Sequence, residues 1–239
     1  MHHLGHTRSV YRRDHLLLSP DTFVRAPLPG MNRATAIIHV APTTGAKFTQ
    51  YTAEFEPGGT LGSAGGQRFV YVLEGAVIIA ETTLKPGGYA YLPAGDTPTV
   101  TAIQPSRAAV IEKRYHPLGD VQMPKLLIGD ETQIEPKALG GDDWLQVRQL
   151  LPDSIEFDFA VNTMAYQPGA SLPMVEAHVM EHGLLMLEGA GIYRLSDSWY
   201  PTQAGDFIWM ASYCPQWFCA VGKTPAKYLI YKDWNRNAY

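Results

Sequence analysis

Short runs of β-branched and aromatic residues recur along the chain, and glycine or proline separates one run from the next. Such runs are typical of strands, and Gly and Pro are typical of the turns between them. The 239 residues include 22 glycines and 18 prolines. Many short strands with regular turn signals predict an all-β sandwich or barrel. Clear examples are residues 36–40, 109–111 and 228–231.

The pattern also repeats, because three landmarks of the first half return in the same order in the second half. The offsets between the pairs are 111, 114 and 118 residues, a slow drift that lengthening loops explain. Three matched pairs in one order indicate an internal duplication. The pairs are Pro57-Gly58 with Pro168-Gly169, Glu74-Gly75 with Glu188-Gly189, and Gly87-Gly88 with Gly205-Asp206.

The duplication predicts two tandem barrels joined by a linker. Residues 117–145 are interrupted by Gly, Pro and Asp and read as a linker. We therefore expect a first barrel with an N-terminal arm over residues 1–116 and a second barrel over residues 146–239. Residues 144–151 fit either a helical turn or a strand, and their period does not decide between the two.

Charge and composition exclude several classes of protein. There are 19 basic and 23 acidic residues, a net charge of −4, which predicts neither a nucleic-acid partner nor an anionic-membrane partner. No run approaches the roughly 20 apolar residues that span a bilayer. The N-terminus has no apolar core of a signal peptide, and its His2, His3 and His6 are expected to form a flexible tail.

Two cysteines, Cys214 and Cys219, do not make a disulfide framework in a chain of this size. We expect both thiols to be reduced, buried and inert. Reduced thiols and the absence of a signal peptide predict a cytoplasmic protein.

The strongest chemical signal is the octapeptide Glu176-Ala177-His178-Val179-Met180-Glu181-His182-Gly183. If the segment is extended, Glu176 and His178 lie on one face, because side chains alternate across a strand. A short turn then brings His182 to the same point from the neighbouring strand. A carboxylate and two imidazoles at this spacing predict a first-row metal site inside a small β-barrel.

The same letters also match H-x-x-E-H, the inverted zinc-protease signature, with Glu181 as the base. That motif requires a helix, so that both histidines share one helical face. Gly183 follows the second histidine at once and Pro173 precedes the first by five residues, so we favour the strand interpretation.

The spacing from Gly169 to Gly189 resembles the first motif of the cupin superfamily, G-x5-H-x-H-x3,4-E-x6-G, with the ligand order permuted. Cupins take a final ligand from a second motif, and here Gln216 is the good ligand in place. The resemblance predicts a ligand set of Glu176, His178, His182 and Gln216. Two nitrogens and two oxygens suit Mn²⁺ or Fe²⁺ and do not distinguish them from Co²⁺ or Ni²⁺. Four protein ligands leave positions open on an octahedral ion, as catalysis requires.

The corresponding stretch of the first half, residues 59–69, offers neither a histidine nor a carboxylate. Its second motif, residues 92–98, also lacks a histidine. We therefore expect the first barrel to be metal-free and to serve packing or assembly.

A two-barrel cupin with a permuted Glu-x-His-x3-His motif in its second barrel resembles the (S)-ureidoglycine aminohydrolase family over nearly the whole chain. The resemblance is carried by that motif and by four further segments. They are Tyr11-Arg12-Arg13-Asp14, Leu28-Pro29-Gly30, Lys113-Arg114-Tyr115 and Tyr231-Lys232-Asp233-Trp234-Asn235-Arg236.

The resemblance implies hydrolysis of (S)-ureidoglycine to (S)-ureidoglycolate and ammonia in purine (allantoin) catabolism, with Mn²⁺ as the metal. It places substrate-pocket residues at Tyr193, Tyr228 and Lys232, and Glu176 joins them as a catalytic group as well as a ligand. Tyr193 and Tyr228 are expected to donate hydrogen bonds to the substrate. Lys232, desolvated beside a metal, is expected to have a lowered pKa and to act as the base.

Two alternatives share the scaffold: a metal-dependent cupin dioxygenase or decarboxylase acting on a small acid, and a binding protein without turnover. Fold alone does not decide among these three functions. The usual three-histidine ligand set of dioxygenases is absent, which weighs against that alternative. Aromatic-rich sheet edges lead us to expect a homo-oligomer.

Overall fold

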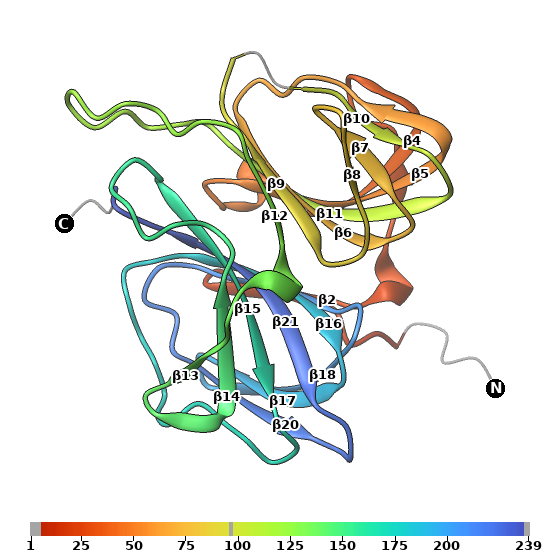
Figure 1. The fold of residues 1–239 in the computed structure, drawn as a ribbon. Coiled ribbons are helices and arrows are strands. Elements are labelled where there is room, and N and C mark those ends of the chain that lie inside the picture. Colours follow the sequence, from red (N-terminus) through yellow and green to blue (C-terminus); the bar gives the residue numbers. More distant parts are fainter. Residues whose placement is uncertain (1–5, 96–97, 237–239) are drawn as a thin grey trace. The chain divides into compact units, whose positions relative to one another are not determined.

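The computed structural model describes residues 6–95 and 98–236, so His2 and His3 of the expected flexible tail lie outside it. The described chain is built from strands and three short 3₁₀ helices, Pro20–Thr22, Pro42–Thr44 and Glu131–Gln133 (Figure 1). The prediction of an all-β fold is confirmed. The strands form two compact units. We call residues 24–134 with 153–158 the first barrel, and the described residues of 1–23, 135–152 and 159–239 the second barrel.

The first barrel is one antiparallel ten-stranded sheet that curls through a long strand, β5. The first part of β5 pairs with β11 and its last residues pair with β10, so one strand serves both walls. Its core is a cluster of buried aliphatic and aromatic side chains from both walls. The strands are β3 (Arg25–Ala26), β4 (Met31–Val40), β5 (Thr49–Leu61), β6 (Gln67–Glu74), β7 (Val77–Ile79), β8 (Thr82–Leu84), β9 (Gly88–Leu92), β10 (Val100–Ala102), β11 (Ser106–Lys113) and β12 (Leu127–Asp130).

The second barrel packs an eight-stranded sheet, ordered β1-β2-β19-β16-β21-β15-β14-β13, against a three-stranded sheet, β18-β17-β20. Its core draws on both sheets, with Tyr193 and Phe218 from one and Tyr166 and Tyr228 from the other. The strands are β1 (Val10–Tyr11), β2 (His15–Leu18), β13 (Lys137–Leu139), β14 (Asp142–Gln149), β15 (Phe159–Tyr166), β16 (His182–Glu188), β17 (Ala190–Leu195), β18 (Ser198–Gln203), β19 (Phe207–Met210), β20 (Gln216–Val221) and β21 (Ala226–Asp233).

The structure divides the chain differently from the boundaries that we expected from sequence. The N-terminal arm belongs to the second barrel, because β2 pairs with β19 from Leu18 opposite Phe207 to His15 opposite Met210 (Figure 1). The expected linker also contains strands: β12 extends the first barrel beside β9, and β13 pairs with β14 in the second. Residues 144–149, whose period was ambiguous, are strand.

The repeated Glu-Gly pair has a steric cause. Gly75 and Gly189 end equivalent strands with φ angles of 78° and 69°, in the left-handed region that glycine tolerates. A Cβ at either position would lie 2.3 Å from a backbone carbonyl oxygen, that of Pro105 or of Pro225. Both halves therefore need glycine at the tight turn that joins β6 to β7 in the first barrel and β16 to β17 in the second.

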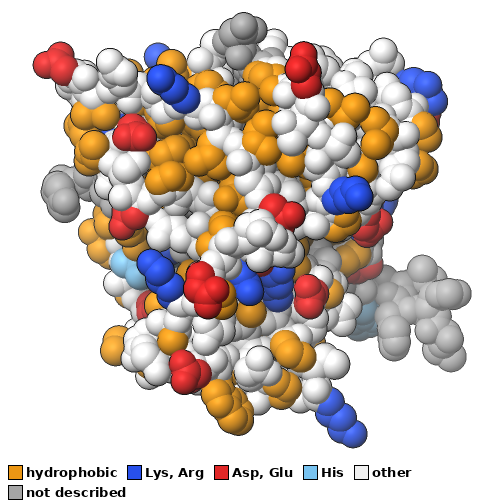
Figure 2. Space-filling model, in the orientation of Figure 1, with side chains coloured by type: hydrophobic (Ala, Val, Ile, Leu, Met, Phe, Trp, Pro, Cys, Tyr) orange, Lys and Arg blue, Asp and Glu red, His pale blue; other side chains and the backbone are white. Residues whose placement is uncertain are grey.

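On the face drawn in Figure 2, basic and acidic side chains are interspersed and do not form a surface of one sign. This arrangement agrees with the small net charge of −4. Across the described residues, every helix is too short or too polar to pass through a lipid bilayer.

Candidate metal centre

The first and second motifs meet at an isolated β-bridge between Glu176 and Gln216. The two residues exchange both backbone hydrogen bonds, each 2.8 Å long. Side chains of directly opposed residues project on the same side of a strand pair. The bridge therefore brings the Glu176 carboxylate beside the Gln216 amide, although 40 residues separate them along the chain.

His178 lies between these two groups. Its Nε2 is 3.6 Å from Glu176 Oε2 and 3.2 Å from the Gln216 amide nitrogen. The loop that carries His178 is tied to the second motif, because Tyr213 N–H donates to the His178 carbonyl at 2.8 Å. The Gln216 amide oxygen accepts a hydrogen bond from the Tyr193 hydroxyl at 3.1 Å and keeps a second lone pair.

His182 opens β16 and is only 3% exposed. Its ring meets that of His178 edge to face, with centroids 4.7 Å apart. Burial, followed by the charges of His178 and Lys232, holds the pKa of His182 well below its usual range. The imidazole is therefore neutral at pH 7, which is the form that binds metals. Its Nδ1 is buried without a hydrogen-bond partner among the described residues.

The donor groups of this site can be compared with those that a metal ion requires. A buried, unpaired imidazole nitrogen is costly unless something absent from the protein completes it. A carboxylate, two imidazoles and an amide oxygen are donors that first-row divalent ions accept. The donor set fits such an ion.

One cavity of about 330 Å³ in the second barrel is lined by every site residue that the sequence predicts. Those seven residues are Glu176, His178, His182, Tyr193, Gln216, Tyr228 and Lys232. Tyr228 and Lys232 are four residues apart on β21, so they point to the same side of the strand. His182 faces Lys232 across the β16–β21 pair, which places both at one level of the barrel.

The two predicted tyrosines are neutral donors. Burial raises the pKa of Tyr193 and of Tyr228 well above the usual value of 10. Both hydroxyls therefore keep their protons at any physiological pH. The Tyr228 hydroxyl lies 2.5 Å from the hydroxyl of Tyr166, whose pKa burial also raises.

Known proteins resemble the chain over almost its whole length. An (S)-ureidoglycine aminohydrolase of Arabidopsis thaliana is 41% identical over 240 residues, which cover 98% of this chain and 80% of that protein. An (S)-ureidoglycine aminohydrolase of Escherichia coli (strain K12) is 32% identical over 92% of this chain and 88% of its own length. The chain belongs to the (S)-ureidoglycine aminohydrolase family.

The fold of this family member is supported independently. A family model described as an EutQ-like cupin domain matches residues 43–115, within the first barrel. The crystal structure of protein Ylba from E. coli superposes with a TM-score of 0.86 at 30% identity, covering 99% of this chain and 98% of the other. The expected two-barrel cupin fold is therefore confirmed.

Sequence reasoning missed three residues near this family member's cavity. Asn162 and Lys137 line it, and Tyr166 lies behind it on Tyr228. Asn162 had one detectable signal, since asparagine is depleted in strands and here interrupts an apolar run. Tyr166 and Lys137 had none, because aromatic residues and lysines are common in strands and linkers.

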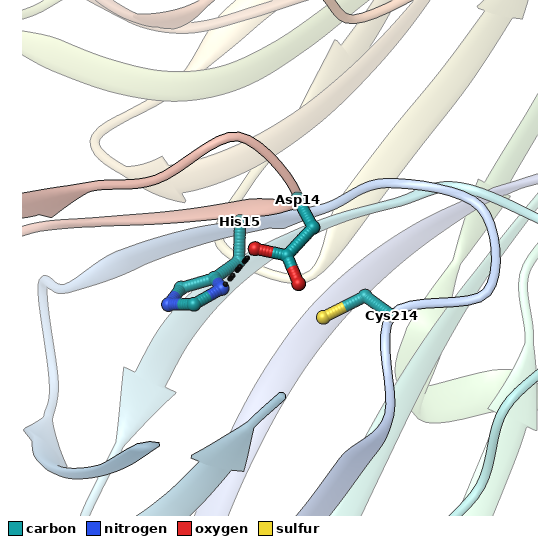
Figure 3. A group of neighbouring side chains, drawn as sticks. All are labelled: Asp14, His15 and Cys214. Atoms are coloured by element: carbon teal, nitrogen blue, oxygen red, sulfur yellow. Dashed lines mark hydrogen bonds and ion pairs between the residues drawn. The ribbon is translucent and has the colours of Figure 1, made fainter. Parts of the chain in front are cut away.

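A second group of ligand-type side chains lies in the same barrel. Figure 3 shows the side chains of Asp14, His15 and Cys214 gathered together. Their ligand atoms all fall within 4.8 Å of one another, a criterion that Glu176, His178 and His182 do not meet. We nevertheless favour the predicted centre, because the ligand atoms of the second group are already hydrogen-bonded or protonated.

Both nitrogens of His15 have partners: Nδ1 lies 2.9 Å from Asp14 Oδ1, and Nε2 lies 2.9 Å from the Tyr200 hydroxyl. Burial, together with Asp14, raises the pKa of Cys214 to about 11, so its sulfur is a protonated thiol at pH 7. Thiols bind metals as thiolates. The group is therefore a hydrogen-bonded anchor for the N-terminal arm.

The cysteines and the protease alternative are also resolved by the structure. Both cysteines are free, as expected, but Cys219 is only half-buried, contrary to the expectation that both are buried. Residues 177–181 contain no helix, and Glu181 accepts a hydrogen bond from the Trp209 indole at 3.1 Å. The helical H-x-x-E-H geometry is absent from this described segment.

Proposed function

We propose that this chain catalyses the Mn²⁺-dependent hydrolysis of (S)-ureidoglycine to (S)-ureidoglycolate and ammonia in the catabolism of purines through allantoin. Its relatives in A. thaliana and E. coli carry the name of that activity. The observation that carries the proposal is a single cavity lined by a carboxylate, two imidazoles, an amide, two phenols and an amine. Its volume of about 330 Å³ suits a small substrate.

In the proposed site, Glu176, His178, His182 and Gln216 hold the metal ion. The unpaired Nδ1 of His182 and the carboxylate–imidazole contact of 3.6 Å support this set. When bound, the ion supplies positive charge that polarises the substrate and makes water more acidic.

The protein's own groups then orient the substrate and move protons. Ureidoglycine carries a carboxylate, an amino group and a ureido group on one carbon. Tyr193 and Tyr228, which keep their protons, donate hydrogen bonds to carboxylate or ureido oxygens. The Lys232 amine takes a proton from water as the new C–O bond forms. The C–N bond breaks, and the amino group leaves as ammonia after it receives a proton.

The test is ammonia release from freshly generated ureidoglycine by the purified full-length protein, with added Mn²⁺ and with a chelator. We expect release above the spontaneous background that the chelator abolishes and Mn²⁺ restores. Release that equals the background under both conditions contradicts the proposal. Oxygen uptake with bound Fe²⁺ would instead favour the dioxygenase, and a metal-free native protein would favour the binding protein.

We further propose that the protein is a cytoplasmic homo-oligomer with metal in its second barrel alone. Two free cysteines support a reducing compartment. Light scattering of the purified protein tests the oligomer, and metal analysis tests the stoichiometry, which we expect to be one ion per chain.

A further inference from the structure

Asn162 is the polar exception in an apolar wall of the cavity. It lies in the interior of β15, opposite Ile230, and is 7% exposed. Its neighbours along this wall of the cavity, Val147, Met164 and Ile230, are apolar. An amide in the interior of a buried strand is unfavourable unless both its ends are hydrogen-bonded. A residue that breaks the local pattern in a cavity wall is a candidate for a role in function.

The partners of this amide are Lys232 and the backbone. With its oxygen facing β21, Asn162 accepts a hydrogen bond from Lys232 Nζ at 3.1 Å, and its nitrogen donates to the Val161 carbonyl at 3.0 Å. The opposite orientation would set the amide nitrogen against the lysine amine and its oxygen against a carbonyl. The hydrogen-bond partners therefore fix the orientation.

The first barrel has a corresponding hydrogen bond between side chains at the equivalent strand positions. Tyr51 lies opposite Val110, and its hydroxyl donates to Glu112, two residues further along β11, at 2.8 Å. Asn162 lies opposite Ile230 and contacts Lys232, two residues further along β21. In both barrels a side chain of one strand thus holds the end of a charged side chain on the next strand.

We propose that Asn162 is a positioning residue, whose amide oxygen holds the Lys232 amine at the cavity beside His182. This inference rests on the proposed function, because it gives Lys232 the task of acting on the substrate. The amide holds the amine through a dipole and forms no carboxylate ion pair with it. Leucine matches asparagine in branched shape and in number of side-chain heavy atoms but offers no acceptor, and aspartate keeps an acceptor in the same place.

The first measurement does not depend on catalysis. Lys232 is acetylated by an amine-reactive ester in the full-length protein, and its rate is compared with that of exposed Lys223 by peptide mass spectrometry. In Asn162→Leu we expect the ratio to rise several-fold, because nothing on β15 holds the amine. In Asn162→Asp we expect it to stay at or below the native value. An unchanged ratio in Asn162→Leu overturns the proposal.

The second measurement is steady-state kinetics of the Mn²⁺-loaded protein. Loss of the hydrogen bond that holds the Lys232 amine lowers kcat by about 2- to 10-fold in Asn162→Leu, with KM and metal content close to native. The control is Thr163→Val, which changes a buried polar group on the opposite face of β15 and should leave kcat unchanged. Faster acetylation with native kcat shows that holding Lys232 is irrelevant to catalysis and overturns the proposal.

The acetylation and kinetic measurements distinguish a failure of this inference from a failure of the proposed function on which it rests. If the native protein releases no chelator-sensitive ammonia, the proposed function fails, and the acetylation ratio still decides whether Asn162 holds Lys232. If the native protein is active and the ratio is unchanged, the function stands and the positioning role is wrong.

Discussion

The two barrels carry different side chains at the same pair of facing strand positions. In the first barrel, Arg68 faces Glu112 across β6 and β11, and in the second, His182 faces Lys232 across β16 and β21. Arg68 Nη2 lies 2.7 Å from Glu112 Oε1, and its Nη1 donates to the Gly62 carbonyl at 2.6 Å. The first barrel thus carries its own cation, paired with its own carboxylate.

At the equivalent positions, the described part of the second barrel does not repeat this arginine–carboxylate pair. Its equivalent position holds a neutral histidine with an unpaired Nδ1, beside a carboxylate on Glu176 and an open cavity. At this pair of positions the first barrel therefore holds an ion pair, whereas the second holds a histidine and a lysine that line a cavity. This contrast agrees with the proposed metal ion in the second barrel.

The largest effect is expected from His182→Ala. Removing one of two imidazole ligands should reduce metal content strongly and lower ammonia release to the spontaneous background, since metal affinity depends on every ligand. Metal analysis and the ammonia assay measure the two effects. The matched control is His39→Gln, which removes a buried histidine of the first barrel and should retain one ion per chain. Native metal content in His182→Ala would contradict the proposed ligand set.

The next effect concerns stability of the first barrel. Arg68→Met leaves the Glu112 carboxylate without its cation, although the Tyr51 hydroxyl still donates to it; the Arg68 and Glu112 side chains are 3% and 27% exposed. Breaking a buried pair costs about 3 kcal/mol when the remaining charge keeps some solvent, so the free energy of unfolding should fall by that amount. Metal content should not change.

Spectroscopy can assign this loss to the correct barrel. All five tryptophans lie at position 144 or later, in the second barrel, so their fluorescence reports that barrel, whereas far-UV circular dichroism reports both. We expect the urea transition followed by dichroism to shift. The double variant Arg68→Met/Glu112→Leu should recover much of the loss, because two apolar side chains leave no unpaired charge. No recovery would mean that Arg68 stabilises through packing alone.

The sequence predicted the strands, the duplication and the donors Glu176, His178 and His182 because each leaves a local pattern, whereas Tyr193, Tyr228 and Lys232 came from the family resemblance. Glycine at the tight turns, alternating side chains and ligand spacing are all visible in one stretch of chain. The arm of β2 was assigned to the wrong barrel, since its pairing with β19 joins residues nearly 200 positions apart. Asn162 and Tyr166 were missed for the same reason, because their hydrogen-bond partners lie on β21 and only the strand register shows which residues are neighbours.

A smaller effect on activity is expected from Tyr166→Phe. The change removes the hydroxyl that lies 2.5 Å from that of Tyr228 and leaves the ring packing intact. Loss of one hydrogen bond of about 1 kcal/mol lowers kcat roughly 5-fold if Tyr228 acts on the substrate. Steady-state kinetics with metal content held at native level measures it. Thr163→Val serves again as the control. A native kcat in Tyr166→Phe would show that the Tyr166 hydroxyl does not contribute to catalysis.

The smallest effect is the pH dependence of stability that arises from the buried His39 of the first barrel. Burial, followed by the charge of Arg107, lowers the pKa of His39 to about 3, and its Nε2 bonds the Thr52 hydroxyl at 2.9 Å. The folded pKa is below the unfolded value of about 6.5, so between these values the unfolded chain binds one more proton. Stability from this residue is therefore complete above pH 6.5 and is lost as pH falls towards 3.

From pH 7 to pH 6 the His39 contribution to the free energy of unfolding should fall by about 0.7 kcal/mol. Urea unfolding followed by dichroism at the two pH values measures it, and His39→Gln should show a pH slope smaller by that amount. The tryptophan transition should have the same slope in both proteins, because His39 lies in the barrel without tryptophan. Equal dichroism slopes would mean that His39 binds its proton in the folded state as readily as in the unfolded chain. The interior of the first barrel would then accept a charge at His39 as well as the Arg68–Glu112 pair.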